Sequence, residues 1–411
     1  MERETHVDVY DPFDPGFQAD PYPAYARLRA HHPVHRHESD QAPPFYALSR
    51  FADVWDAVRR PEDFSSARGL TFYPDEIETL GLAPTIVMLD PPVQTALRGL
   101  IGRGFTPRRV AELEPTVRAF VRGRIAAMEQ TVADGGVADL HRDYSSTIPT
   151  FVLAELLGVP EADRARFDPW VSALTKLQNE GFAPGALTGA EVVAEMFEYF
   201  TGTIARRRER PADDLIGALV AAELDGQRLS DWEILGFCFV MVAGGNDTSG
   251  ALISHGITLL EQFPDQRALL LDDPGLIGNA TLEFLRMESS VQALARTTTR
   301  EVVVGETAIP AGEKVVMLYG AANRDEAEFG PTAGTLDVRR EIPRHLGFSS
   351  GPHFCIGSHL ARLQARVAFE ELLASHPGVG ADVAAGVRHE SAFTRGWVSL
   401  PATRLGVTAS C

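Results

Sequence analysis

The sequence predicts a mainly α-helical protein with a small β region. Three observations favour this fold class: apolar residues recur at helical spacing over most of the chain, strand-like alternation is confined to two short groups, and no internal repeat or low-complexity linker divides the chain. The 411 residues are 45% apolar and 23% charged, which suits a globular protein with a sizeable core. We therefore expect a single domain that spans residues 1–411.

The N-terminal half is predicted to be helical around one long loop. The first 60 residues predict a helix, a short strand and a second helix, in the segments PYPAYARLRAHH, FYALSR and ADVWDAVRR. Residues 66–88 lack periodicity and carry glycine, proline and isolated aromatic residues, and a long loop inside a compact domain is usually functional. Residues 91–205 return to a helical pattern, with breaks at 158–160 and 181–189.

The C-terminal half holds the longest predicted helix and most of the β structure. Residues 232–263 form the longest apolar-periodic segment, and helical signals continue through 266–289. The segment TTREVVVGETAIPAGEKVVMLYG then alternates with turns, which predicts a small antiparallel sheet. The chain closes with a helix in SHLARLQARVAFEELLASH and a strand-poor tail.

Charge and cysteine content exclude several classes of protein. Lysine and arginine total 38 against 56 acidic residues, and a net charge of −18 argues against nucleic acid as a partner. No stretch of about 18 apolar residues predicts a membrane span, and the N-terminus lacks the apolar core of a signal peptide. The three cysteines are too few and scattered for a disulfide framework or a zinc site, so we expect a reducing, cytoplasmic compartment.

Cys355 lies in the segment FSSGPHFCIGSHLAR, between Gly351 and Gly357 and just ahead of a predicted helix. Glycine permits positive φ and the close approach of a flat ligand, and a helix N-terminus favours the thiolate over the thiol. From the turn alone, Cys355 is a packed structural cysteine, a nucleophile, or a ligand to a large flat group. The nucleophile interpretation lacks a complete triad, because only His353 stands nearby.

The segment FCFVMVAGGNDTSGALISHG, residues 237–256, has two interpretations. It begins as a helix that is apolar on every side and then meets Gly244 and Gly245, with Asp247 and Thr248 following. One interpretation is a loop followed by a helix N-cap, for which Asp and Thr are preferred. The other is one long helix opened at the glycines, in which Thr248 bonds back to the Gly244 carbonyl while an acid and a hydroxyl face a cavity.

The cysteine segment resembles the haem-binding signature of the cytochrome P450 family, F-x-x-G-x-H-x-C-x-G followed by x-x-L-A-R. The matching residues are Phe348, Gly351, His353, Cys355, Gly357, Leu360, Ala361 and Arg362. The resemblance implies the P450 fold, a triangular prism with haem b (iron protoporphyrin IX) between a long central helix and a cysteine-bearing helix. It makes Cys355 the axial thiolate ligand of the haem iron, and Phe348, Gly351 and Gly357 cofactor-binding residues.

The glycine pair with its acid and alcohol matches the oxygen-activation motif of the same family. The resemblance implies that Asp247 and Thr248 are catalytic and deliver protons to bound dioxygen through water. It also implies that Gly244 contacts the cofactor and that Gly245 contacts the substrate.

A third motif stands in LEFLRMES, where Glu283 and Arg286 lie at i and i+3 of a predicted helix. Most such pairs are exposed and contribute a few tenths of a kcal/mol. The family resemblance, however, implies a buried structural pair that Arg340, in the segment LDVRR, completes.

The expected partners of the haem propionates include one departure from the family pattern. In MLDPPVQTALRG, Gln94 and Arg98 lie one turn apart, where the family usually has His-x-x-x-Arg. Arg98 matches, whereas Gln94 offers an N–H without charge. Arg296 and His353 complete the set, each expected to form a charge-assisted bond to a carboxylate.

These motifs, which follow in family order from about residue 16 to the C-terminus, identify the chain as a member of the bacterial P450s, close to a subgroup with mycobacterial members. The resemblance implies a cytoplasmic, monomeric haem-thiolate monooxygenase that inserts one oxygen atom from O₂ into a hydrophobic small molecule. Electrons are expected from NAD(P)H through a separate ferredoxin and ferredoxin reductase. The candidate docking residues for the ferredoxin are Arg103, Arg108, Arg109 and Arg344.

Family analogy also suggests a substrate pocket, whose candidate wall residues are Phe72, Tyr73, Gly245, Leu294 and Phe393. Other functions remain open: a haem-binding sensor without turnover, a haem-thiolate peroxygenase or isomerase, and a helical protein without haem in which Cys355 is merely packed. The intact acid–alcohol pair counts against the sensor and the peroxygenase.

Overall fold

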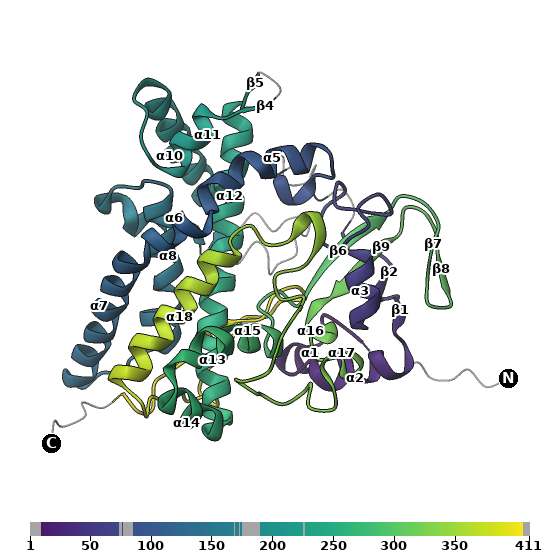
Figure 1. The fold of residues 1–411 in the computed structure, drawn as a ribbon. Helices are drawn as coiled ribbons and strands as arrows, with labels where there is room; N and C mark the ends of the chain where they lie inside the picture. The colour runs from purple at the N-terminus through teal and green to yellow at the C-terminus, as the bar shows by residue number, and fades with distance from the viewer. Residues whose placement is uncertain are drawn as a thin grey trace.

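The computed structural model describes residues 10–73, 76, 85–167, 169–171, 173–174, 190–224 and 227–405. Helices fill one side of the molecule, and a five-stranded sheet with short accompanying helices forms the other (Figure 1). The predicted fold class, mainly α with a small β region, is confirmed. Within the described residues, no helix has the length and apolar character needed to cross a membrane.

The N-terminal elements agree with the sequence prediction and add three short ones. The predicted elements are α2 (Tyr22–His31), β2 (Phe45–Leu48) and α3 (Phe51–Ala57), and the additional ones are α1 (Pro15–Ala19), β1 (Val34–His37) and β3 (Phe64–Ser65). The sequence VHRH did not indicate a strand because β1 lies at the edge of the sheet, where most of its side chains are not buried.

The five-stranded sheet has the order β1-β2-β9-β6-β3 and includes β6 (Ala293–Thr298) and β9 (Lys314–Leu318). β6 and β9 are antiparallel, as are the hairpin strands β7 (Val302–Val304) and β8 (Thr307–Ile309), so the predicted antiparallel pairing is confirmed there. β2 pairs in parallel with β9, which joins the N-terminal strands to this sheet and was not predicted. All of β9 is buried, because the strand is central.

The longest apolar segment forms two helices on one line, α12 (Asp231–Gly245) and α13 (Asp247–Gln262) (Figure 1). Between them Asn246 keeps a near-helical backbone (φ −88°, ψ −63°), so the chain path is one helix with a local opening. α12 begins with a capping box between Ser230 and Glu233. α18 (Ser358–Ser375), which follows the cysteine turn, packs against α13 and against α7 (Glu114–Ala133).

The remaining helices that position the site surround this pair. They are η1 (Ile86–Met88), α5 (Val93–Ile101), α6 (Pro107–Glu112), the π-helical turn η3 (Leu140–Ser145), α8 (Thr147–Leu156), α10 (Ala190–Glu209), α11 (Leu215–Ala221) and α15 (Ile277–Met287). The predicted break at residues 158–160 is confirmed, since Gly158 takes the left-handed conformation (φ +67°) after α8. The predicted break at 181–189 lies outside the described residues.

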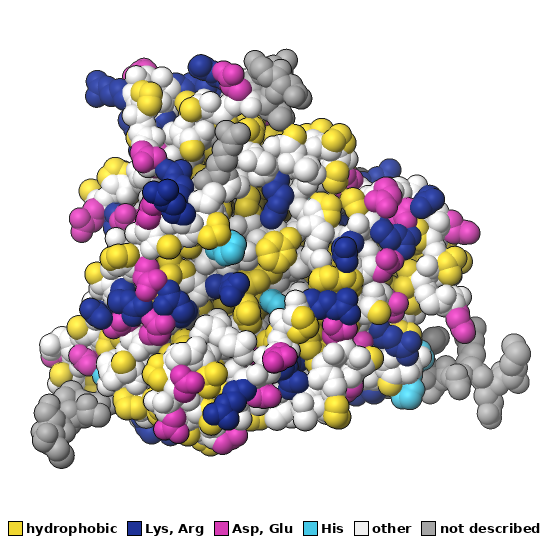
Figure 2. Space-filling model, in the orientation of Figure 1, with side chains coloured by type: hydrophobic (Ala, Val, Ile, Leu, Met, Phe, Trp, Pro, Cys, Tyr) yellow, Lys and Arg dark blue, Asp and Glu magenta, His cyan; other side chains and the backbone are white. Residues whose placement is uncertain are grey.

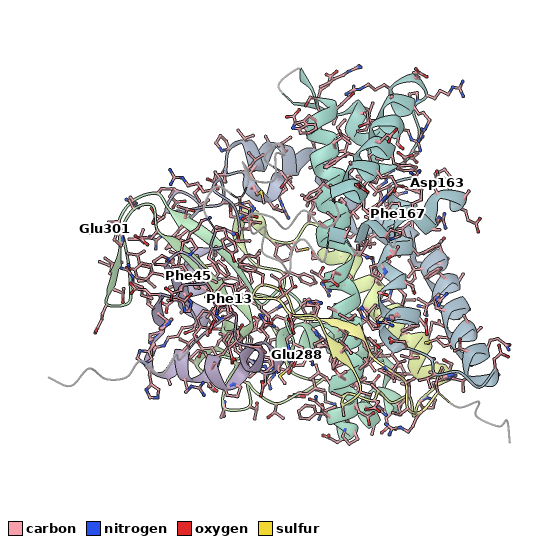
Figure 3. The ribbon with its side chains drawn as sticks, turned by 180° about the vertical axis from the view of Figure 1, so that it is seen from behind. Phe13, Phe45, Asp163, Phe167, Glu288 and Glu301 are labelled. Carbon is pink, nitrogen blue, oxygen red and sulfur yellow. The ribbon has the colours of Figure 1, made fainter. Side chains whose placement is uncertain are left out.

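A compact aromatic cluster lies between the N-terminal helices and the five-stranded sheet. The rings of Phe45 and Phe72 are stacked with centroids 5.0 Å apart, and Phe13 meets Phe72 edge-on at 5.4 Å. Phe13 and Phe45 are labelled in Figure 3, far from Phe167, which belongs to the helical core on the other side. The molecule therefore has a helical core and a separate aromatic core beside the sheet.

Candidate functional site

A cavity of about 290 Å³ lies where α5, α12, α13, β6 and the segment after residue 345 meet. Most of the side chains that line it are apolar. The lining residues with a polar or reactive side chain are Gln94, Arg98, Thr248, Ser249, Ser290, Tyr319, Ser349, His353, Cys355 and Gln364. The sequence-predicted cysteine and threonine therefore face the same enclosed, largely apolar space, as ligand pockets commonly require.

Backbone bonds hold Cys355 at the cavity. Its N–H donates to the Phe348 carbonyl at 2.8 Å, which closes the turn. Gly351 takes φ +67°, and an added Cβ there would come within 2.9 Å of the Val58 carbonyl oxygen, so only glycine fits. Burial raises the pKa of the Cys355 thiol, while the Gly357 N–H and the Arg98 charge oppose that rise.

Gly357 departs from the expectation drawn for it. Its φ is −84°, so positive φ is not the reason for glycine at this position. An added Cβ would meet only the Cys355 Sγ, at 4.0 Å. Glycine at this place therefore leaves the space beside the sulfur open, which fits the close approach of a flat ligand.

The central helix opens at the glycines as the second interpretation predicted. Thr248 Oγ1 donates to the Gly244 carbonyl at 2.7 Å, and Asn246, not Asp247 or Thr248, stands at the start of α13 without a side-chain cap. An added Cβ on Gly244 or Gly245 would meet nothing within 4 Å, so both glycines present bare backbone to the cavity. The interpretation as a loop with an Asp or Thr N-cap was wrong.

Asp247 does not lie where the sequence suggested. It is partly buried but is absent from the cavity lining, and it forms no hydrogen bond or ion pair with any residue that the structure describes. Its carboxylate instead faces two histidines. Burial lowers the pKa of His141 to about 4, and the Asp247 charge opposes that shift there and at His389. The acid therefore stands behind Thr248 rather than beside it in the cavity.

Three cationic or potentially cationic side chains gather near the cysteine turn. Arg98 lines the cavity without a hydrogen bond or ion pair to any described residue, and burial lowers its pKa. Burial also lowers the pKa of His353 to about 3, and the Arg296 and Arg98 charges add to this. Arg296 is buried on β6, donates to the Ala295 carbonyl at 2.7 Å and is not among the cavity-lining residues.

Gln94 is engaged with the cysteine turn itself. Its side-chain N–H donates to the Pro352 carbonyl at 2.7 Å, and the residue is only 1% exposed. This bond uses the side-chain amide that the sequence suggested for a haem propionate. Gln94 therefore links α5 to the turn that carries Cys355.

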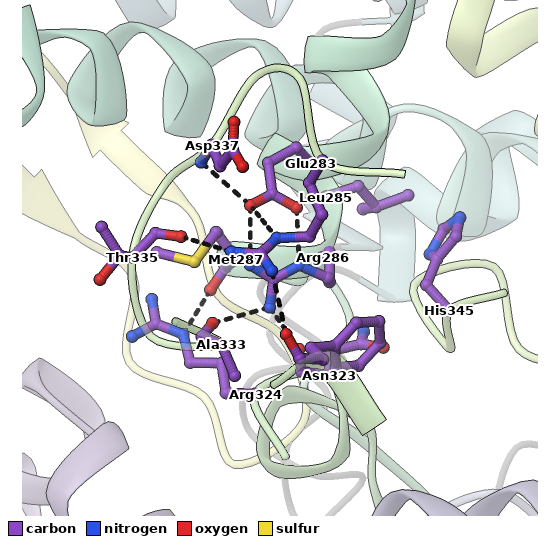
Figure 4. Close-up of polar contacts among 12 residues, drawn as sticks. Glu283, Leu285, Arg286, Met287, Asn323, Arg324, Ala333, Thr335, Asp337 and His345 are labelled. Atoms are coloured by element: carbon purple, nitrogen blue, oxygen red, sulfur yellow. Dashed lines mark hydrogen bonds and ion pairs between the residues drawn. The ribbon is translucent and has the colours of Figure 1, made fainter. Parts of the chain in front are cut away.

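The Glu283–Arg286–Arg340 set forms a buried ion triad, of which Figure 4 shows Glu283 and Arg286. Glu283 and Arg286 are both fully buried and their charged atoms are 2.6 Å apart, while Arg340 Nε lies 3.1 Å from Glu283 Oε1. Arg286 also donates to the carbonyls of Asn323 and Ala333, at 2.7 and 2.8 Å. The triad thus ties α15 to the chain that leads into the cysteine turn.

The structure separates the five candidate substrate residues into two groups. Gly245 and Leu294 line the cavity. Phe72, Tyr73 and Phe393 do not: the Phe72 ring packs against both others, with centroids 5.0 and 4.7 Å away, in the aromatic cluster beside the sheet. The rings of these three therefore pack against each other and not against this cavity, so their place in a substrate wall stays a prediction.

Several wall residues escaped the sequence analysis. They are Phe105, Phe237, Val240 and Met241, whereas Ile86 and Val87, which also line the cavity, belong to the loop at 66–88 that family analogy places in the pocket wall. Helical spacing could have found two of them, since Met241 and Phe237 lie four and eight residues before Gly245 and share its face. The segment was instead assigned wholly to a buried core, because it is apolar on every side.

The candidate docking arginines that the structure describes are each paired with an acid. Arg108 lies 3.3 Å from Glu112, Arg109 lies 2.5 Å from Asp213, and Arg344 lies 2.6 Å from Glu328. The Arg103 side chain lies outside the described residues. Figure 2 shows basic and acidic side chains interspersed on the face that it presents.

The residues at the cavity fit an iron macrocycle such as haem. Cys355 offers a sulfur ligand, the glycine backbone of the central helix leaves room for a flat group, and the unpaired Arg98 suits a carboxylate. The structure shows no alternative protein-only metal site, since no three His, Cys, Asp or Glu side chains gather as ligands within the described residues.

Comparisons with known proteins agree with this fit. The family model described as Cytochrome P450 matches residues 278–376. Cytochrome P450 130 of Mycobacterium tuberculosis is 50% identical over 365 residues, which cover 87% of this chain and 88% of that protein. Vitamin D(3) 25-hydroxylase of Pseudonocardia autotrophica is 38% identical over 97% of both chains. Among solved structures, cytochrome P450 CYP268A2 of Mycobacterium marinum in complex with pseudoionone has a TM-score of 0.86 and 34% identity, covering 96% of this chain and 99% of that one.

Proposed function

The chain belongs to the cytochrome P450 family of haem-thiolate monooxygenases, and we propose that it oxidises a hydrophobic small molecule with electrons from NAD(P)H delivered by a ferredoxin and its reductase. The observation that carries the proposal is the shared cavity, in which Cys355 and Thr248 face one largely apolar space. The names of two relatives support the substrate class, since one hydroxylates vitamin D(3) and the other was solved with pseudoionone.

When bound, haem supplies the activation of dioxygen. We assign Cys355 to its iron, since the sulfur lines the cavity and receives the Gly357 N–H. We assign Arg98 to a haem carboxylate because it has no partner among the described residues, with His353 and Arg296 beside it. Gln94 is assigned to the cysteine turn, which its amide holds.

We further propose that Thr248 and Asp247 supply protons in sequence. The Thr248 hydroxyl reaches the cavity and holds its proton toward the Gly244 carbonyl, from which it can turn to a bound oxygen. Asp247 stands behind it, on the side of His141 and His389, where it can replace the proton through water. The largely apolar lining of the cavity favours this side as the route for protons.

The substrate class is tested by optical titration of the purified haem protein. Steroids, fatty acids, terpenes and aromatic polyketides are added in turn, and the Soret band is followed. We expect a shift from low to high spin with apolar compounds that fit the cavity, and product formation when electrons and O₂ are supplied. A protein that binds no haem even when haem is provided would overturn the assignment of Cys355. A haem protein that responds to none of the apolar classes would overturn the proposed substrate class.

The ferredoxin proposal is tested by charge reversal. Arg103→Glu combined with Arg109→Glu should slow reduction by ferredoxin about 10-fold at low salt, because electrostatic steering raises association rates, and the difference should shrink as salt screens it. Arg36→Glu, on the edge strand β1, is the matched control. Unchanged reduction rates in the double variant would overturn docking at these arginines.

A further inference from the structure

A second, smaller cavity lies beside the first. It measures about 220 Å³ and opens between η1, α5, α11 and α12. Its lining is Thr85, Ile86, Leu89, Val93, Leu97, Ile101, Leu219, Leu229, Glu233 and Phe237. Apart from one hydroxyl and one carboxylate, every lining side chain is apolar. None of the sequence motifs assigns a role to this space.

The helix that carries Gln94 and Arg98 shows why the two cavities adjoin. On α5, Val93, Leu97 and Ile101 recur at every fourth residue and face the second cavity. Gln94 and Arg98, each one residue further along, face the first. Successive helical residues are turned by about 100°, so these are neighbouring stripes of one helix.

Two side chains stand at the boundary. Ile86 of η1 and Phe237 of α12 line both cavities. Along α12, Glu233 lies four residues before Phe237 and lines only the second cavity, while Met241 lies four residues after it and lines only the first. The walls therefore continue from one space into the other, with the Ile86 and Phe237 side chains between them.

The polar groups of the second cavity limit what it can hold. Thr85 is 5% exposed, and its hydroxyl has no hydrogen-bond partner among the described residues, which is unusual for a buried polar atom. The hydroxyl is enclosed in its present rotamer, so a bond to a ligand requires another staggered χ1 rotamer. Glu233 already accepts the Ser230 N–H and O–H at one oxygen, and its negative charge at the rim disfavours a carboxylate.

We propose that the second cavity is a subsite for the far end of an elongated apolar substrate that ends in a neutral hydroxyl. The apolar chain passes between Ile86 and Phe237, its near end lies in the cavity of Cys355, and its hydroxyl bonds to Thr85. This rests on the proposed function, because only the near end is placed for oxidation. It narrows the substrate class from hydrophobic molecules in general to long, uncharged ones.

The first test compares chain length and end group in the full-length haem protein. Octanol, dodecanol and hexadecanol, with the matching carboxylic acids, are titrated and their dissociation constants are read from the Soret shift and from calorimetry. We expect affinity to rise about 3-fold per added methylene as the chain enters the second cavity. At equal length the alcohol should bind about 10-fold more tightly than the acid. Affinity that does not rise with length, or acids that bind as well as alcohols, would overturn the proposal.

The second test removes the subsite without touching the first cavity. Leu219→Phe fills the second cavity from α11, and Thr85→Val removes the hydroxyl at constant volume. We expect Leu219→Phe to weaken hexadecanol binding about 10-fold and Thr85→Val about 5-fold, with octanol affected far less by Leu219→Phe. Thr131→Val, on the exposed side of α7, is the matched control.

Two outcomes separate this inference from the proposed function. If both variants bind haem and shift with apolar ligands but treat long and short alcohols alike, the subsite is wrong and the monooxygenase assignment is unaffected. If even the unaltered protein lacks a thiolate-type haem spectrum, the proposed function itself fails. Should Leu219→Phe not fold, Thr85→Val alone decides the point, because it changes no volume.

Discussion

The two sides of the main cavity are built in different ways. On the cysteine side, which comprises the Glu283–Arg286–Arg340 triad and the turn at residues 348–357, the backbone and buried charges determine the geometry: the left-handed Gly351 and the bond from Cys355 to Phe348 add to the triad. On the apolar wall, which comprises residues 86–105 and 237–245 together with Leu294, the shape of the cavity comes from side chains such as Ile86 and Phe237. Few other residue types can therefore replace those on the cysteine side, whereas many can replace those on the apolar wall.

This difference separates two kinds of requirement. A ligand for iron must be held at one place, so the cysteine side depends on groups that no other residue type replaces. A substrate wall needs only apolar volume of a given shape, and apolar residues of similar size exchange at modest cost. We therefore expect substitutions on the cysteine side to cost stability, and those on the apolar wall to change which molecules bind.

The largest effect is expected at the buried triad. Glu283→Gln leaves Arg286 and Arg340 without their carboxylate partner, and breaking a buried ion pair costs about 3–5 kcal/mol of unfolding free energy. Urea unfolding of the purified protein measures it. Glu112→Gln, which removes the partner of the exposed Arg108, is the matched control and should change stability by less than about 0.5 kcal/mol. Equally small losses of unfolding free energy in both variants would show that the buried triad does not hold the cysteine side as proposed.

The next largest effect is expected on the rate of product formation, with little change in stability. Thr248→Val keeps the volume and removes the hydroxyl at the cavity, so product formation should fall about 100-fold while hydrogen peroxide release rises. Substrate affinity should change little, since the methyl groups still line the wall. Thr131→Val is a close control, because Thr131 makes the same hydroxyl-to-carbonyl bond one turn back, to Ala127, on exposed helix surface. An unchanged ratio of product to peroxide would rule out the role of Thr248.

The sequence was sufficient for features whose geometry is local. The opening at the glycines was one of two interpretations of a few adjacent residues, and the structure places Thr248 Oγ1 on the Gly244 carbonyl as that interpretation expected. The Glu283–Arg286 pair was local as well, whereas its union with Arg340 came only from the family resemblance. Local hydrogen bonding and helical spacing explain these successes.

The sequence was insufficient for features that depend on packing between residues far apart in the chain. Phe72 and Phe393 are apolar and suit a core or a cavity equally, and only their contact across more than 300 residues shows that they are core. The parallel pairing of β2 with β9 is likewise invisible without the fold.

A smaller effect is expected from pH, through a buried histidine of the central helix α13. His255 is fully buried, bonds to the Glu288 carbonyl at 3.1 Å and faces the Arg388 and Arg395 charges; burial lowers its pKa to about 3. The unfolded chain takes up this proton below about pH 6.5, whereas the folded protein does not. Stability is therefore complete above pH 6.5 and falls as the pH drops toward 3, by about 1.4 kcal/mol per pH unit for this group.

Measuring the unfolding free energy between pH 6.5 and 4.5 separates the contribution of His255 from that of Glu288. Burial would raise the pKa of Glu288, but the charges of Arg395, His255 and Arg324 lower it to about 2, so its stabilising effect is lost only below pH 4.5. His141 and His345, each with a pKa lowered by burial to about 4, act in the same direction as His255. His255→Leu should reduce the slope of stability against pH by about one proton, and the exposed His31→Leu should not. Equal slopes in both variants would show that His255 does not contribute.

The smallest effect separates the substrate wall from the protein core. It compares two apolar substitutions, of which one should lower stability and the other should weaken ligand binding. Phe72→Leu, in the aromatic cluster, should lower the unfolding free energy by about 1 kcal/mol and leave the dissociation constants of apolar ligands unchanged. Leu294→Ala, on β6 at the cavity, should weaken ligand binding about 5-fold and cost less stability than a fully packed leucine would, because one side of it already meets open space. Urea unfolding and Soret titration of both variants give the four values. If Phe72→Leu weakened binding while Leu294→Ala changed only stability, the aromatic cluster would belong to the substrate wall after all. The expected opposite pattern would show that the substrate meets β6 and the central helix, and that the cluster beside the sheet only supports them.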